Sequence, residues 1–141
     1  MLFNDDFNCL VIATKQEVAK NLVTKVRVMN HYLPSWLKLT TVEDNKLSLR
    51  YSNGSQIKAT SAAGDAGRSE ALSLLVFDEA AFIDNIGEIW ASAQQTLATG
   101  GGCIALSTPY GTGNWFHQTW TRAEGGENDF LPIKFLPSNI L

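Results

Sequence analysis

The sequence predicts an α/β fold in which helices flank a mainly parallel sheet and a β-hairpin is inserted. Three observations predict this class. Short, continuously apolar runs alternate with segments of helical periodicity, as in parallel sheets that are buried on both faces. Asn53-Gly54 lies between two stretches of alternating polarity, which is a hairpin signal. The length of 141 residues and the 45% hydrophobic content are those of one folded domain.

The first half of the chain is expected to form a strand, a helix and the hairpin. Residues 8–14, NCLVIAT, form an apolar run that fits a buried strand. Apolar residues then recur at helical spacing, at Val18, Leu22, Val26 and Met29. Pro34 is expected to end this helix. In residues 46–61, apolar and polar residues alternate on both sides of Asn53-Gly54, so this stretch is expected to form the antiparallel hairpin.

The second half continues the alternation of strands and helices. Buried strands are expected at residues 72–77 and 104–106, because both runs are apolar. Helices are expected at residues 86–97, ending in the sequence TGGG, and at residues 115–123. The sequence FLPIKF, residues 130–135, is expected to form a last strand.

Composition and charge restrict the partners and the compartment. The net charge of -3 gives no overall basic field, so any DNA contact is expected on a local surface. Cys9 and Cys103 lie inside apolar runs and are interpreted as core residues of a protein in a reducing compartment. No apolar run is long enough to span a membrane, and the N-terminus has no signal-peptide pattern.

Two adjacent acids, Asp78 and Glu79, directly follow the apolar run of residues 72–77. Unpaired charges are costly to bury, so these carboxylates are expected to meet a partner or solvent. One interpretation is that Asp78 starts a turn or caps the next helix. The other is a Walker B motif, in which the Asp contributes to a Mg²⁺ site and the Glu polarises the attacking water. The pair by itself does not decide between them.

Three polar groups lie just past the ends of three expected strands. They are Thr14, Asp78 with Glu79, and Ser107 with Thr108. In parallel sheets, ligands gather at the edge formed by the carboxyl ends of the strands. The three groups are therefore expected to converge on one edge of the sheet, which favours the functional interpretation of the acids.

Three motifs, in this order, resemble the large terminase subunit of tailed bacteriophages, the ATP-driven DNA-packaging motor. They are LVIATKQEVAKNLV, LLVFDEAAFI and IALSTPYGTGNWFHQTW, and the resemblance extends from about Cys9 to about Leu136. The resemblance implies a P-loop NTPase fold of the ASCE, RecA- and helicase-like kind. It also implies ATP as the substrate, Mg²⁺ as the cofactor and double-stranded DNA as the cargo.

The resemblance also implies roles for residues of this chain. Asp78 would be the Mg²⁺-associated acid and Glu79 the catalytic carboxylate. Ser107, Thr108 and Pro109 resemble the family's coupling motif, which senses the nucleotide state. A simple turn is the alternative for Ser107 and Thr108.

Three further residues have two interpretations each. Arg68 lies where terminases carry an arginine before Walker B. One interpretation is that it contacts a phosphate, DNA or a neighbouring subunit, and the other is that it is a solvated loop cation. Ser69 stands where the family usually has glycine. Lys15 and Gln16 lie where helicase-like motors touch DNA or relay force, although a solvated helix face is the favoured alternative.

One motif of the family is missing from the sequence. No G-x-x-x-x-G-K-[ST] phosphate-binding loop occurs, and in the family this loop precedes the strand that corresponds to residues 8–14. Residues 1–141 are therefore expected to be a partial ATPase domain that lacks the P-loop strand, with the phosphate-binding segment upstream of it and the nuclease domain downstream. The isolated chain is expected to hydrolyse no ATP.

The resemblance implies a homo-oligomeric ring that works with the portal protein and the small terminase subunit. Its place would be the host cytoplasm, transiently on the procapsid, with no membrane contact. Two alternatives stay open: a fragment of a helicase-like DNA-dependent ATPase, and a non-catalytic remnant or assembly module. The helicase alternative lacks its usual signature, because Ala80 and Ala81 follow the acid pair.

Overall fold

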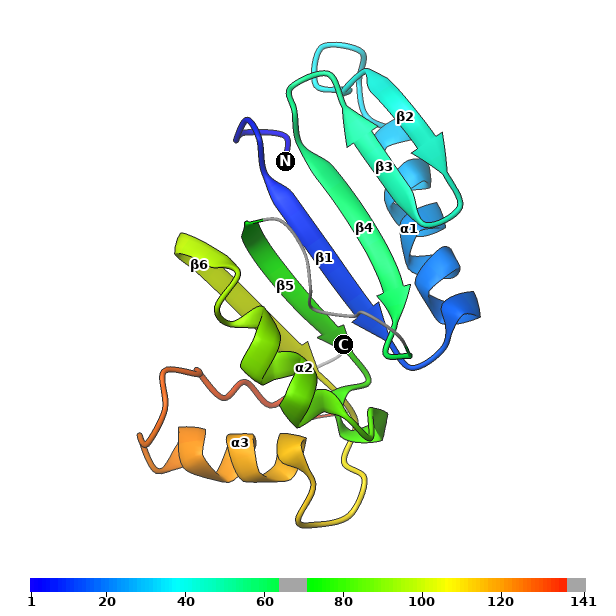
Figure 1. Cartoon of the computed structure of the whole chain (residues 1–141). Helices are drawn as coiled ribbons and strands as arrows, with labels where there is room; N and C mark the ends of the chain where they lie inside the picture. Colours follow the sequence, from blue (N-terminus) through cyan, green and yellow to red (C-terminus); the bar gives the residue numbers. More distant parts are fainter. Residues whose placement is uncertain (64–70, 137–141) are drawn as a thin grey trace.

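A six-stranded mixed sheet forms the centre of the fold (Figure 1). The computed structural model describes residues 1–63 and 71–136. In sheet order the strands are β2 (Thr41–Asn45), β3 (Ser48–Tyr51), β4 (Gln56–Ser61), β1 (Asn8–Ala13), β5 (Leu72–Asp78) and β6 (Leu97–Leu106). The helices are α1 (Gln16–His31), the short 3-10 helix η1 (Ala80–Phe82), α2 (Ile86–Ala93) and α3 (Trp115–Glu124). The predicted α/β class with a mostly parallel sheet and flanking helices is confirmed.

The antiparallel part of the sheet differs from the prediction in two ways. The hairpin at Asn53-Gly54 exists as β3 and β4, but β4 also pairs in parallel with β1, so it belongs to the main sheet and is not an insertion. A further strand, β2, pairs antiparallel with β3. No pattern in the sequence marks β2, because all five of its residues are exposed and show no buried alternation.

Two hydrophobic cores lie on opposite faces of the sheet, and residues of β1 alternate between them. Val11 contributes to the core under α1, which packs Ala19 and Val23 inward. Ile12 contributes to the other core, under η1 and α2. Figure 1 shows α1 beside β3 and β4, and α2 and α3 beside β5 and β6. The central strand is therefore covered on both faces.

The two cysteines are core residues, as the sequence predicted. Cys9 is buried, and Cys103 is half-buried against the core on the α2 side. Burial raises the pKa of Cys9 to about 11 and that of Cys103 to about 12. Both thiols therefore stay protonated near neutral pH, which makes them poor nucleophiles and poor metal ligands.

Two predictions for the second half of the chain were wrong. Helix α2 ends at Ala93, and the sequence TGGG lies inside β6, because that segment pairs with β5 from Leu97 onward. The pairing is irregular near this start, and Gly100 has a φ of +82°, a conformation typical of glycine in a bulge. Residues 130–135 form no strand, and Pro132 has no N–H to donate to one.

Two aromatic residues after β6, Trp115 and Phe116, are partly buried and pack against the core on the α2 side. Trp115, at the start of α3, lies 5.8 Å from Phe77 and 6.2 Å from Trp90, measured between ring centroids. This contact ties α3 to the sheet. None of the described helices is long and apolar enough to cross a membrane.

Candidate functional site

The predicted polar groups lie along one edge of the sheet. Strands β1, β5 and β6 are neighbours and run parallel, so their carboxyl ends lie at the same edge. Thr14 follows β1, and Asp78 is the last residue of β5, in register with Leu106. Ser107 comes directly after Leu106. The acid pair therefore lies between the chain that follows β1 and the chain that follows β6.

The backbone at Glu79 has an unusual conformation. Its φ is 53° and its ψ is 50°, in the left-handed region that residues other than glycine rarely adopt. Such a conformation costs roughly 1–2 kcal/mol and persists only when surrounding structure enforces it. Strain of this kind clusters at functional sites, so it marks Glu79 as a candidate.

Neither acid of the pair is neutralised within the described part of the chain. Asp78 and Glu79 are half-buried, and neither carboxylate has a hydrogen-bond or ion-pair partner there. Glu79 occupies the N-cap position of η1, yet its side chain makes no capping hydrogen bond. Both carboxylates are therefore available to a ligand.

Buried residues hold the turn that follows Glu79. Ala80, Ala81 and Ile83 are buried in the core on the α2 side. The Phe82 N–H donates to the Glu79 carbonyl at 2.9 Å, and the Ile83 N–H donates to the Ala80 carbonyl at 3.3 Å. The acids thus project from a turn that is anchored in the core.

The residues after β6 contact this turn directly. The Ser107 hydroxyl accepts a hydrogen bond from the Ala81 N–H at 3.1 Å and donates to the Thr108 carbonyl at 2.8 Å. Thr108 and Pro109 are exposed, and the Thr108 hydroxyl has no partner among the described residues. Ser107 is thus committed to structure, whereas Thr108 is free for a ligand.

A second contact joins the same two segments. The rings of Phe82 and Tyr110 lie 4.4 Å apart between centroids, with an interplanar angle of 31°. Neither this ring pair nor the Ser107–Ala81 hydrogen bond was predicted from the sequence. Only the position of Tyr110, directly after the STP sequence, gave a signal.

The remaining predicted site residues make no recognisable cluster. Lys15 is the N-cap of α1 and Gln16 its first residue, and both are exposed. They follow β1 and so lie at the same edge of the sheet as the acids. Arg68 lies outside the described residues.

The donor atoms of the acid pair suit a hard cation. Mg²⁺ prefers oxygen ligands and is commonly held by one or two carboxylates together with substrate phosphates. Asp78 and Glu79 supply unpaired carboxylates of this kind. The described residues contain no group of three His, Cys, Asp or Glu side chains able to hold a metal ion.

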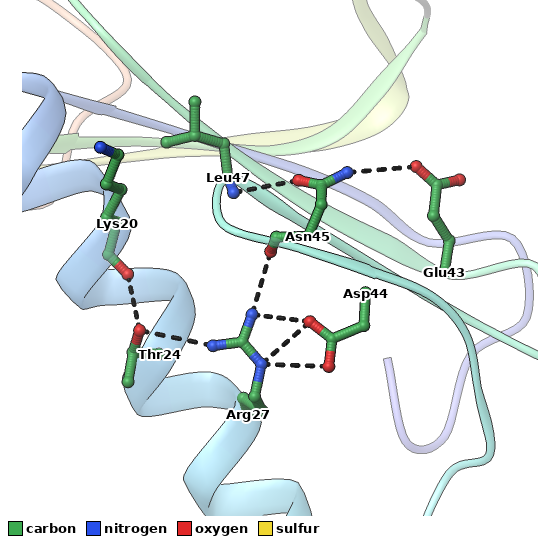
Figure 2. Close-up of polar contacts among 7 residues, drawn as sticks. All are labelled: Lys20, Thr24, Arg27, Glu43, Asp44, Asn45 and Leu47. Carbon is green, nitrogen blue, oxygen red and sulfur yellow. Dashed lines mark hydrogen bonds and ion pairs between the residues drawn. The ribbon is translucent and has the colours of Figure 1, made fainter.

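A different region holds a cavity of about 520 Å³ between α1 and the β2–β3 turn. Figure 2 shows Arg27 of α1 there, with its guanidinium group pointing at Asp44 and Asn45. Arg27 and Asp44 form an ion pair with an Nη2–Oδ1 distance of 2.7 Å. The central charges of this cavity therefore neutralise each other, and it lacks the unpaired acids of the sheet edge.

Comparisons with known proteins identify the family and the fold. A model of the family described as terminase large subunit, T4likevirus-type, N-terminal, matches residues 1–136. The large terminase ATPase domain of Thermus phage P74-26 has 25% sequence identity and a TM-score of 0.64, over 84% of this chain and 54% of that one. A mutant of that domain, in which an arginine is changed to alanine, has 23% sequence identity and a TM-score of 0.62. The match covers 82% of this chain and 53% of the mutant chain.

The large terminase of the thermophilic bacteriophage D6E shares the fold. Its TM-score is 0.69 at 13% identity, over 89% of this chain and 32% of that one. The chain therefore spans about half the length of the two P74-26 structures and about a third of the D6E structure.

Proposed function

The chain belongs to the T4likevirus-type terminase large subunit family, in its N-terminal region, and from this premise we propose that it is part of an ATPase motor that moves double-stranded DNA into a procapsid. The proposal includes the P-loop NTPase fold in its ASCE form. Because the sequence has no Walker A loop, we propose that residues outside this chain bind most of the phosphate charge.

One observation carries the proposal. Asp78 and Glu79 have no hydrogen-bond or ion-pair partner among the described residues, and they lie at the carboxyl end of β5, on a strained turn, between two neighbouring parallel strands. A protein that used these acids for stability would give them partners. An ATPase instead needs carboxylates that meet a cation and a water only when nucleotide binds.

The chemistry assigned to the acids follows from their donor atoms. Phosphoryl transfer requires positioning and charge stabilisation more than covalent chemistry by the protein. Glu79 would accept a hydrogen bond from the attacking water and orient its oxygen toward the γ-phosphorus, while Asp78 would help to hold Mg²⁺. When bound, Mg²⁺ neutralises charge that develops on the phosphate oxygens.

Thr108 and Pro109 are assigned to coupling. The free Thr108 hydroxyl would bond to the γ-phosphate or the water in one nucleotide state only, which is the differential contact that a switch requires. Pro109 stiffens the chain after it. Lys15, Gln16 and Arg68 remain candidate contacts to DNA or phosphate.

The assembly proposed around the chain follows the family. It is a homo-oligomeric ring on the procapsid in the host cytoplasm, in contact with double-stranded DNA, the portal protein and the small terminase subunit. None of these partners is needed to explain the acid pair.

A packaging assay tests this function. A full-length large subunit that carries this sequence should protect procapsid DNA from nuclease in an ATP-dependent way, and Asp78→Asn should abolish that protection. Protection that needs no ATP, or that survives Asp78→Asn, would contradict the proposal. DNA-stimulated hydrolysis without packaging would support the helicase-like alternative, and DNA or portal binding without hydrolysis would support the assembly module.

A further inference from the structure

The turn that carries Glu79 is joined to the segment after β6 by two contacts of different kinds. One is the hydrogen bond from the Ala81 N–H to the Ser107 hydroxyl, at 3.1 Å. The other is the ring contact between Phe82 and Tyr110. Both contacts fall within three residues of Glu79.

The hydrogen bond satisfies a group that the turn leaves open. Ala81 lies in the first turn of η1, where backbone N–H groups have no partner within a helix. Ala81 is 7% exposed, so water has little access to this amide. The Ser107 hydroxyl also donates to the Thr108 carbonyl, which fixes the direction of its lone pairs.

The ring contact is not explained by burial. Phe82 is 39% exposed and Tyr110 is 62% exposed, so neither ring is a core residue. Exposed aromatic pairs still hold their segments in a defined orientation. Here the pair holds the end of η1 against the segment between β6 and α3.

From these contacts we propose that Ser107 and Tyr110 are positioning residues that hold Glu79 in its left-handed conformation for catalysis. The inference rests on the proposed function and deepens it, because it separates Ser107 from Thr108. Ser107 acts through the hydrogen bond that it accepts from the Ala81 N–H, whereas Thr108 is the residue assigned above to contact the nucleotide. Loss of either contact lets the turn relax and moves the Glu79 carboxylate away from the water.

Steady-state ATP hydrolysis by the full-length subunit tests the proposal. Ser107→Ala should lower kcat about tenfold or more, because small misplacements of a catalytic group have large effects, and should leave KM for ATP within about twofold. Ser107→Thr keeps the hydroxyl and should restore most of kcat. Tyr110→Ala should lower kcat in the same way, and Tyr110→Phe should not.

Ser55 provides a matched control at the opposite end of the sheet. Its buried hydroxyl accepts from the Phe7 N–H at 3.1 Å and donates to the Asn4 carbonyl at 2.9 Å, the same bonding pattern as that of Ser107. Ser55→Ala should lower thermal stability and leave kcat unchanged. If Ser107→Ala does not fold, as judged by circular dichroism, Tyr110→Ala decides, because its side chain is exposed.

Three outcomes would overturn the inference. Unchanged kcat in Ser107→Ala or Tyr110→Ala, beside a loss of hydrolysis in Glu79→Gln, would overturn the positioning role alone. An equal fall of kcat in Ser55→Ala would show a general structural effect and overturn it too. Full hydrolysis by Glu79→Gln would overturn the positioning role together with the proposed function.

Discussion

Two acidic segments of this molecule, the end of β2 and the turn after β5, differ in how their charges are satisfied. In β2, Asp44 accepts hydrogen bonds from Arg27 at 2.7 Å, 3.0 Å and 3.2 Å, and Arg27 also donates to the Asn45 carbonyl at 2.9 Å (Figure 2). In the turn after β5, Asp78 and Glu79 have no partner within the described part of the chain. Asp44 has no positive φ because it lies in a strand, whereas the backbone of Glu79 is left-handed.

The difference separates an acid that is paired within the fold from two acids that have no partner among the described residues. Arg27 and Asp44 fasten α1 to the hairpin, but the pair is partly exposed and so contributes only about 0.2–1 kcal/mol. The strain at Glu79 costs more than this pair returns. Among the described residues other than glycine, Asp6 and Glu79 have a positive φ of 53°, and for Glu79 this strain lies beside a second acid at a strand end, which makes the turn a candidate site.

A large effect is expected for the Mg²⁺ requirement of ATP hydrolysis. Asp78→Asn removes one anionic oxygen ligand, so the Mg²⁺ concentration for half-maximal hydrolysis should rise by about tenfold or more. Asp44→Asn, the matched change in β2, should leave this Mg²⁺ concentration unchanged. A Mg²⁺ titration of hydrolysis by the full-length subunit measures both, and equal responses of the two variants would erase the distinction.

The next largest effect is expected for the coupling of ATP hydrolysis to DNA packaging. Thr108→Ala should leave ATP binding within about twofold while packaging falls about fivefold or more, a typical coupling energy. Thr24 is the control, because its hydroxyl is already bonded to the Lys20 carbonyl at 3.0 Å and to Arg27 at 3.4 Å. Thr24→Ala should not alter packaging. Normal packaging by Thr108→Ala, or a loss explained by misfolding in circular dichroism, would leave only the turn interpretation.

The free energy of unfolding should change in opposite directions when Glu79 and Asp44 are replaced. Glu79→Gly removes a left-handed strain of about 1–2 kcal/mol and adds roughly 0.5–1 kcal/mol of backbone entropy loss, so the free energy of unfolding should rise by about 0.5 kcal/mol. Hydrolysis should be lost at the same time. Urea denaturation followed by tryptophan fluorescence measures the change, and a large destabilisation by Glu79→Gly would mean that the carboxylate supports the fold.

The smallest effect is expected for the paired acid. Asp44→Asn should lower the free energy of unfolding by about 0.2–1 kcal/mol, and less at high salt, because the pair is partly exposed. The same urea experiment at low and high salt checks this. A loss of several kcal/mol would show that the ion pair is a main determinant of the fold.

Local patterns predicted most of the fold. Residues 8–14 and 72–77 were recognisable as strands because parallel strands are buried on both faces and read as apolar runs. Residues 94–102 were misassigned because their pairing with β5 is irregular and depends on tertiary contact. β2 was missed because it is an exposed edge strand whose sequence need not be apolar.

The candidate site divides in the same way. The edge position of Asp78, Glu79 and Ser107 follows from strand ends, which the sequence marks. The left-handed backbone of Glu79 and the contacts of its turn with the segment after β6 do not follow from local sequence. These contacts join residues about 26 positions apart through packing. The functional roles of all these residues remain predictions.

Single-turnover ATP hydrolysis by the Glu79→Gln variant of the full-length subunit tests the central claim most directly. Glutamine keeps the shape of the side chain and removes its charge, so ATP should still bind while the chemical step slows by several orders of magnitude. Asp44→Asn, measured in parallel, should hydrolyse ATP at the unmodified rate. Hydrolysis by Glu79→Gln within about twofold of the unmodified rate would show that the strained, unpaired acid is not the catalytic group.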